Sequence, residues 1–247
     1  MLRDTSRRLT VVLLLGALIL VVVAFRMRPS RTVVPRPVGY HALAAPFAAG
    51  SISGRVMVAS SAARPGLSMP SLPPGCESRV LAWTTSGGLA DTVVALVNVH
   101  AGLAPRIAGP TVSLDRCGFS PRVSVALEGA TATVNVTRGD HRVQASLGEV
   151  RVFDAAATGN SRIALVGDGL WTVRCATSHP WEQAWIWVSS NPYATVTDAS
   201  GRFHLDDVPA GDWVMKVWNP SLGERTTEVL VEANRDAVTT VRFQQGD

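Results

Sequence analysis

Short runs of alternating apolar and polar residues, separated by turn residues, follow one another along the C-terminal part of the chain. The segment 193–243 (YATVTDASGRFHLDDVPAGDWVMKVWNPSLGERTTEVLVEANRDAVTTVRF) shows this pattern throughout. Asp198 can begin an Asx turn, Gly201 can adopt a positive φ angle, and residues 209–211 (Pro-Ala-Gly) supply the next turn. Period two then places the side chains of the following strand on two faces: Trp213, Met215 and Val217 on one, Val214, Lys216 and Trp218 on the other. The pattern predicts an all-β sandwich.

The N-terminus has a different pattern. Residues 9–25 (LTVVLLLGALILVVVAF) are 17 uncharged residues flanked by arginines, at the short end of what spans a bilayer as a helix. Arg26 and Arg28 follow where a signal-peptide cleavage site would need small residues. Residues 1–27 are therefore predicted to be an uncleaved signal-anchor and transmembrane helix, with secretion after cleavage as the alternative. The Pro-, Arg- and Ala-rich residues 28–49 read as a tether.

Charge excludes nucleic acid as a partner. The formal net charge is +4, but the first 36 residues hold seven arginines and one aspartate, which is +6, and the remaining 16 basic and 18 acidic residues give −2. After residue 36, no cluster of basic residues interleaved with aromatics occurs. With 47% apolar and 17% charged residues, the chain can bury a substantial core in one or two domains.

Two stretches carry a resemblance to the carboxypeptidase regulatory-like domain, a transthyretin-like β-sandwich. They are TDASGRFHL followed by VPAGDW, and, for the opening strands, SISGRVMV (51–58) and DTVVALVNV (91–99). The resemblance implies that residues 50–109 and 191–247 form this sandwich in two pieces. Residues 110–190 would then be an inserted domain.

Residues 111–188 contain six short strand candidates, which suggest a second sandwich: 122–127, 130–136, 141–147, 162–166, 170–175 and 184–188. DRCGFSPRVSVALEGATATVNV, HRVQA and RCATSHPWEQAWIWV resemble cupredoxins of the kind fused to regulatory-like domains in bacterial envelope proteins. The resemblance implies a copper site with His141, Cys175 and His179 as equatorial ligands. A thiolate, two imidazoles and a weak axial donor suit both oxidation states of copper.

The chain departs from the cupredoxin pattern around this site. The cysteine and the histidine are spaced as Cys-x3-His, and Glu182 stands where a methionine is expected after Pro-Trp. Glu182 or Gln183 is therefore the predicted axial donor, and Glu182 would lower the reduction potential. Arg142 follows His141, and its cation is expected to oppose a bound copper ion.

The chain has three cysteines, an odd number, so at most one internal disulfide forms. Cys76 with Cys117 is the predicted pair, which leaves Cys175 for metal; Cys117 with Cys175 is the alternative. Trp185 and Trp187 share a face by period two, and an inward-facing core pair is favoured over a carbohydrate-stacking platform.

Known catalytic signatures are missing, including HExxH, GxSxG and phosphate-binding glycine loops, so the chain is not expected to be an enzyme. Two functions follow from the sequence. One is a copper-binding or electron-transfer module, anchored in the inner membrane and facing the periplasm, with a redox or envelope protein as partner. The other is a metal-free structural or binding module for polysaccharide or protein, in which the same residues serve packing.

Overall fold

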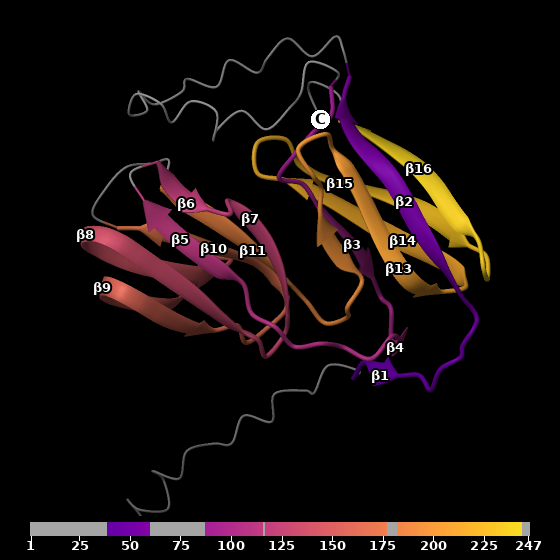
Figure 1. Ribbon diagram of the computed structural model, residues 1–247, viewed down its shortest axis with the longest axis horizontal. Helices are drawn as coiled ribbons and strands as arrows, with labels where there is room; N and C mark the ends of the chain where they lie inside the picture. Colours follow the sequence, from indigo (N-terminus) through magenta and orange to yellow (C-terminus); the bar gives the residue numbers. More distant parts are fainter. Residues whose placement is uncertain (1–38, 60–86, 116, 177–181, 244–247) are drawn as a thin grey trace, which may run out of the picture. The chain divides into compact units, whose positions relative to one another are not determined.

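A computed structural model describes residues 39–59, 87–115, 117–176 and 182–243, and these residues form sixteen β-strands and no helix (Figure 1). The predicted all-β class is confirmed. The predicted transmembrane helix at 1–27 lies outside the described residues, as do residues 28–38 of the predicted tether. Within the described ranges, no helix has the length and apolar character that a membrane span requires.

The described end of the predicted tether contains a short strand. β1 (His41–Ala42) pairs in parallel with β4 (Ala101–Gly102). The N–H of His41 donates to the carbonyl of His100, and the N–H of Leu43 donates to the carbonyl of Gly102, both at 2.8 Å. A two-residue strand has no alternating period, so only this long-range pairing defines it.

Two sheets face each other in the part of the chain that shows the regulatory-like resemblance. One has the order β12-β3-β14-β15, and its strands are β12 (Ala194–Val196), β3 (Val93–Val97), β14 (Gly211–Asn219) and β15 (Gly223–Val231). The other has the order β13-β2-β16, and its strands are β13 (Arg202–Pro209), β2 (Ala49–Val58) and β16 (Asp236–Phe243). Figure 1 shows β2, in indigo, beside β16, in yellow, with which it pairs in parallel.

The core between these sheets is built from alternate residues of each strand. Ile52, Val56, Leu96 and Met215 are buried within one apolar cluster. Tyr193 is buried in the same cluster, and its hydroxyl donates to the carbonyl of Asp207 at 3.0 Å and accepts from the N–H of Leu103 at 2.7 Å. Both hydrogen bonds offset the cost of burying a hydroxyl group.

The predicted turn after β12 is confirmed. Asp198 Oδ1 accepts hydrogen bonds from the N–H of Ser200 at 2.8 Å and from the N–H of Arg202 at 2.9 Å, which makes an Asx turn. Gly201 has φ of +80°, where a side chain is disfavoured. A local hydrogen-bonding pattern readable from the sequence therefore sets this turn.

We expect Gly201→Ala to destabilise the protein by about 2–3 kcal/mol, because the new Cβ would be strained at this φ and would also collide with backbone atoms. It would meet the carbonyl oxygen of Val56 and lie 2.6 Å from the amide nitrogen of Leu89. Gly223→Ala is the matched control: φ is +76°, but nothing lies within 4 Å of the added Cβ, so about 1 kcal/mol is expected. Urea denaturation measures both, and equal losses would contradict the steric part of the explanation.

The two adjacent aspartates Asp206 and Asp207 lie within β13. The pairing of β13 with β2 shifts between Leu205 and Val208, and Asp207 has φ of 52°. A β-bulge therefore absorbs these two polar residues without ending the strand.

Seven strands between β4 and β12 form one further sheet, in the order β6-β5-β8-β10-β11-β7, with β9 on the free side of β8. Their bounds are β5 (Thr111–Asp115), β6 (Gly118–Ser120), β7 (Val123–Leu127), β8 (Thr131–Leu147), β9 (Val150–Ala164), β10 (Gly169–Cys175) and β11 (Gln183–Ser189). Phe119 of β6 and Ala126 of β7, from the two ends of this order, belong to one buried cluster. The sheet therefore folds over a single core, which also contains Trp171 at 0% exposure.

Two of the six strand candidates prove to be one strand. The segments 130–136 and 141–147 join as β8, which is 17 residues long. The first part of β8 pairs with β5 in parallel, and the second part pairs with β10 antiparallel. The pairing with β9 shifts in register between Val136 and His141, so a bulge stands at the point where β8 changes neighbours.

Trp185 and Trp187 lie on one face of β11, as predicted, but this face is not the sandwich core. Ala184 and Ile186 point into the core of the seven-stranded sheet. The two tryptophans belong to a separate cluster with Val93 and Trp218 of the neighbouring sheet. The prediction of an inward-facing core pair is therefore wrong in its location, because the outer face of β11 is covered by β3, β12 and β14.

Candidate metal centre

Cys175 is the last residue of β10 and faces the core. Trp171 and Val173 share its face of the strand by period two, and all three are buried. Cys175 is opposite Val143 of β8, and its side chain is 7% exposed. It is not part of a disulfide, so it carries a thiol.

His141 lies two residues before Val143 on β8 and therefore on the same face as that buried residue. The antiparallel pairing of β8 with β10 brings it next to Cys175. Its Nδ1 is 3.3 Å from Cys175 Sγ, within the distance of a hydrogen bond to sulfur. The sequence-predicted pair of an imidazole and a thiol is thus brought together, across 34 residues of chain.

Glu182 completes a cluster of three donors. The N–H of Cys175 donates to the carbonyl of Glu182 at 3.2 Å, so the two residues face each other across the β10–β11 connection. The Glu182 side chain is 5% exposed. One carboxylate oxygen of Glu182, Cys175 Sγ and a ring nitrogen of His141 all lie within 4.8 Å of one another, a spacing that one metal ion can bridge.

The two predicted axial donors lie on opposite faces of the sheet. Gln183 is paired with Arg174, which is exposed, and the next residue, Ala184, is buried in the core. Alternation therefore directs Gln183 to the outer face and Glu182 to the side of Cys175. The structure brings Glu182 to the cluster and leaves Gln183 away from it. His179, the predicted second imidazole, lies outside the described residues.

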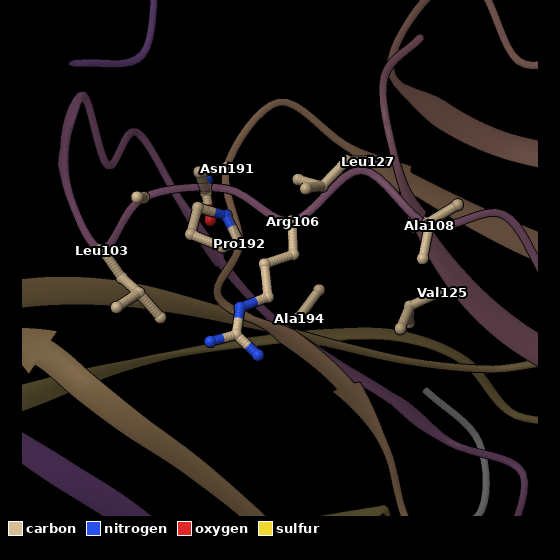
Figure 2. Close-up of a pocket in the computed structure, with 10 residues that line it drawn as sticks. Leu103, Arg106, Ala108, Val125, Leu127, Asn191, Pro192 and Ala194 are labelled. Atoms are coloured by element: carbon tan, nitrogen blue, oxygen red, sulfur yellow. The ribbon is translucent and has the colours of Figure 1, made fainter. Parts of the chain in front are cut away.

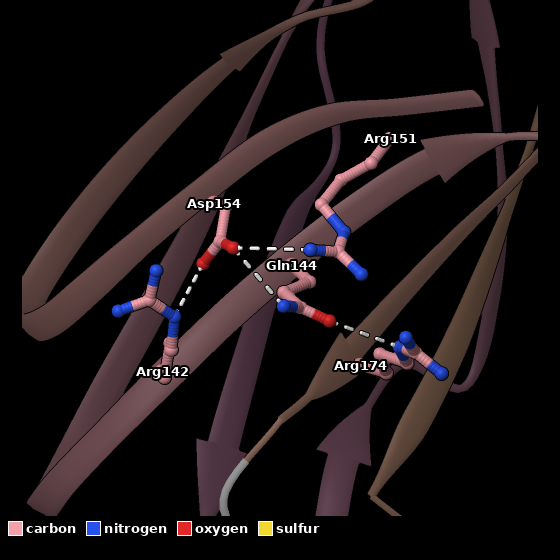
Figure 3. A network of polar contacts seen from close by, with 5 residues as sticks. All are labelled: Arg142, Gln144, Arg151, Asp154 and Arg174. Carbon is pink, nitrogen blue, oxygen red and sulfur yellow. Dashed lines mark hydrogen bonds and ion pairs between the residues drawn. The ribbon is translucent and has the colours of Figure 1, made fainter.

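Arg142 was expected to oppose a metal ion, and its position differs from that expectation. Its Nε lies 2.6 Å from Asp154 Oδ1 of β9, as Figure 3 shows. Residues 141 and 142 point to opposite faces of β8, so the guanidinium is on the outer face and His141 on the inner. Asp154 compensates its charge there. Asp154 was not among the sequence candidates, because it is recognised only once the register of β8 and β9 is known.

The contribution of Asp154 to the stability of the fold is expected to depend on pH. The hydrogen bond from Arg142 is the main cause that lowers the pKa of Asp154 below its ordinary value. A carboxyl group with a lowered pKa in the folded state stabilises the fold at pH values above its unfolded pKa of about 3.9. This contribution is lost as the pH falls through the folded pKa.

We expect Arg142→Gln to raise the midpoint of the Asp154 titration toward about 3.9, followed by NMR of its carboxyl carbon. Arg162→Gln is the matched control, since Arg162 is exposed on the same strand but does not contribute to the Asp154 shift. A shift of equal size in both variants would show that general charge, and not the Arg142 contact, sets this pKa.

The structure describes one of the two cysteines of the predicted disulfide. Cys117 is disulfide-bonded, and its N–H donates to Asp115 Oδ1 at 2.8 Å. Its predicted partner, Cys76, lies outside the described residues. The alternative pairing of Cys117 with Cys175 is not what the structure has, because Cys175 is a thiol.

A second concave feature lies apart from the metal cluster. It is a pocket of about 280 Å³ between the 103–108 segment, β7 and the β11–β12 connection, and its lining contains none of the three donors. Figure 2 shows Arg106 projecting among mostly apolar neighbours. The Asn191 side chain there donates to the carbonyl of Leu96 and accepts from the N–H of Tyr193. The pocket therefore offers little polar chemistry beyond one guanidinium.

Comparison with known proteins gives no family assignment. No protein-family model matches the chain, and no curated protein matches it. The regulatory-like resemblance stays a prediction.

Several solved structures are similar to part of this chain. One is a purple cupredoxin from Nitrosopumilus maritimus, with 18% identity, 32% of this chain and 99% of that chain covered, and a TM-score of 0.28. Another is a pseudoazurin from Sinorhizobium, with 17% identity, 34% and 75% covered, and a TM-score of 0.30. A copper-containing nitrite reductase from Thermus scotoductus has 19% identity, 35% and 23% covered, and a TM-score of 0.28. Similarities this weak do not determine a function for the chain.

Proposed function

We propose that this chain is a copper-binding module for electron transfer or copper handling, in which His141, Cys175 and Glu182 hold the ion and His179 supplies a further imidazole. The observation that carries the proposal is the cluster of three different donor groups within 4.8 Å of one another. A thiolate and an imidazole together favour copper or zinc over magnesium or calcium. A bound copper ion would supply one-electron redox chemistry.

The burial of the donors also supports a cation at this place. Cys175 and Glu182 are 7% and 5% exposed, and each carries a negative charge when it acts as a ligand. Buried anionic ligands and a cation attract each other strongly, because the surroundings screen their charges little. A divalent cation would balance both, so the site should stabilise copper(II) over copper(I) relative to a site with a methionine at position 182.

We propose further that the module works outside the cytoplasm, anchored by residues 1–27, and that it is not an enzyme. The disulfide at Cys117 supports this location, because structural disulfides persist in oxidising compartments. An alkaline phosphatase fusion at the C-terminus tests the topology: periplasmic activity is expected, and activity of a cytoplasmic reporter alone would contradict it.

The metal-free alternative, a polysaccharide-binding module, finds no support among the described tryptophans. The Trp185 and Trp218 rings contact each other edge to face, with centroids 5.9 Å apart. The Lys216 ammonium lies over the ring of Trp187. Sugar stacking needs an open aromatic face, and these rings already pack against protein groups.

Titration of the purified full-length chain with copper(II) tests the proposed function. We expect a strong thiolate-to-copper charge-transfer band that saturates at one equivalent. His141→Asn should weaken binding by more than about 10-fold. His204→Asn is the matched control, because His204 is an exposed histidine paired with Asp206 outside the cluster, and it should leave the band unchanged. Absence of the band in the wild type would overturn the proposal.

A further inference from the structure

The outer face of the seven-stranded sheet is divided into two parts. On β11 and β7, Trp185, Trp187 and Val125 are covered by the cluster shared with β3, β12 and β14. On β8, β9 and β10, the same face carries exposed arginines. The side chains of Arg142 and Arg151 are 51% and 52% exposed, and Arg174 is exposed. One half of the face is therefore already packed against protein, and the other half is an accessible cationic surface.

The arginines of this surface are held in place by two residues (Figure 3). Asp154 contacts Arg142 Nε at 2.6 Å and Arg151 at 3.4 Å. Gln144 is 7% exposed; its Nε2 donates to Asp154 Oδ2 at 3.1 Å, and its Oε1 accepts from Arg174 Nε at 3.2 Å. This network orders three long side chains before any partner arrives, which lowers the entropy lost on binding.

The charge of the network is unbalanced. Three guanidinium groups meet a single carboxylate, so the group carries a net charge of +2. Residues 37–247 as a whole carry −2, and the patch thus stands out against an acidic body. Such a local field attracts acidic surfaces and disfavours basic ones.

The patch is also adjacent to the metal cluster through the backbone. Arg142 follows His141 directly, and Arg174 precedes Cys175. The N–H of Ala176 donates to the carbonyl of Arg142 at 2.7 Å, which ties the two segments together. A protein bound to the arginines would therefore be separated from the donor groups only by the thickness of the sheet.

We propose that this arginine surface, made of Arg142, Arg151 and Arg174 with Gln144 and Asp154, docks an acidic protein partner of the metal centre. That the partner serves the metal centre rests on the proposed function. The docking surface itself is present in the metal-free protein. Arginine suits this role because its planar guanidinium binds carboxylates in a bidentate manner and remains charged.

The test uses residue-specific NMR of the metal-free, ¹⁵N-labelled full-length chain titrated with a decaglutamate peptide. Residue resolution is needed because seven arginines within the first 36 residues also attract an acidic peptide. We expect amide shifts at 142–144, 151–154 and 174 that weaken as salt rises. The double variant Arg142→Gln/Arg174→Gln should weaken this binding by about 10-fold. Arg235→Gln/Arg242→Gln removes the same charge at and beside β16 and should leave it unchanged.

The outcomes separate the two proposals. No shifts at these positions, or equal losses in both double variants, would overturn the docking surface even if the copper band is present. Shifts with anionic phosphatidylglycerol vesicles but not with decaglutamate would also overturn it in favour of a membrane surface. Shifts with decaglutamate in a chain that gives no copper band would support the docking surface while the proposed copper function fails.

Discussion

Cys175→Ser is expected to abolish the thiolate-to-copper absorption band and to lower copper(II) affinity by more than about 100-fold, since losing even an outer-sphere partner of a metal ligand costs 10–100-fold. Cys175 is the sulfur donor of the cluster, 3.3 Å from His141 Nδ1. The thiolate provides both the charge transfer and the soft donor that copper prefers. Serine has a similar size but a hydroxyl that stays protonated at neutral pH, so the metal loses an anionic ligand. The change is measured by visible absorption and by competition with a chelator.

Stability must be followed in the same variant. Cys175 is 7% exposed within the apolar cluster of the seven-stranded sheet, so a buried hydroxyl in its place should cost about 1–2 kcal/mol in the metal-free protein. Glu182→Gln keeps the thiolate and removes one anion. It should therefore retain the band, with weaker copper(II) binding and a higher reduction potential. If Cys175→Ser bound copper as tightly as the wild type, the three-donor site would be refuted.

Trp171→Ala is expected to destabilise the protein by about 3–5 kcal/mol, the usual cost of emptying a buried aromatic position. Trp171 is 0% exposed and belongs to the core enclosed by the seven-stranded sheet. Its Nε1–H also donates to the carbonyl of Gly167 at 3.1 Å. Truncation would leave a cavity and an acceptor without its donor. Urea denaturation followed by circular dichroism measures the loss.

Two comparison variants separate the contributions. Trp171→Phe keeps much of the ring volume and removes the hydrogen bond, so about 1–2 kcal/mol is expected. Val166→Ala changes a nearby side chain that is 68% exposed, and its effect should stay below about 0.5 kcal/mol. A Trp171→Ala midpoint indistinguishable from that of Val166→Ala would show that this residue does not support the core.

Cys175 and His141 lie on strands that enclose the core to which Trp171 belongs. The predictions for Cys175→Ser and Trp171→Ala are therefore connected. Trp171 and Cys175 occupy one face of β10, and Val173 is the residue between them on that face. A loosened core in Trp171→Ala should therefore also weaken copper binding, since metal affinity depends on donors that are held in place before binding.

Features decided by local interactions were readable from the sequence. The strand candidates 170–175 and 184–188 agree with β10 and β11 to within one residue at each end, because period-two alternation depends only on neighbouring residues. The Asp198 turn followed from an Asx hydrogen bond spanning a few residues. The resemblance of the sequence to cupredoxins also implied a thiol and imidazoles as the donors to consider.

Features that depend on pairing between distant strands were not readable. The segment Thr-Arg-Gly-Asp at 137–140 interrupts the apolar alternation, yet β8 continues through it, because β9 pairs with β8 on both sides of this segment, with a shift in register between Val136 and His141. The contact of His141 with Cys175 depends on the register of β8 against β10, and a one-residue slip would turn His141 to the outer face.

The same distinction explains the choice between Glu182 and Gln183. The sequence by itself determined that these two adjacent residues point to opposite faces, because successive side chains of a strand alternate. Only the tertiary structure decided which face is the core: Ala184 and Ile186 pack inward, so Glu182 joins Cys175. Trp185 and Trp187 then face outward, against the neighbouring sheet. Alternation is a local property of the backbone, whereas the side that becomes buried is set by what the whole chain packs against it.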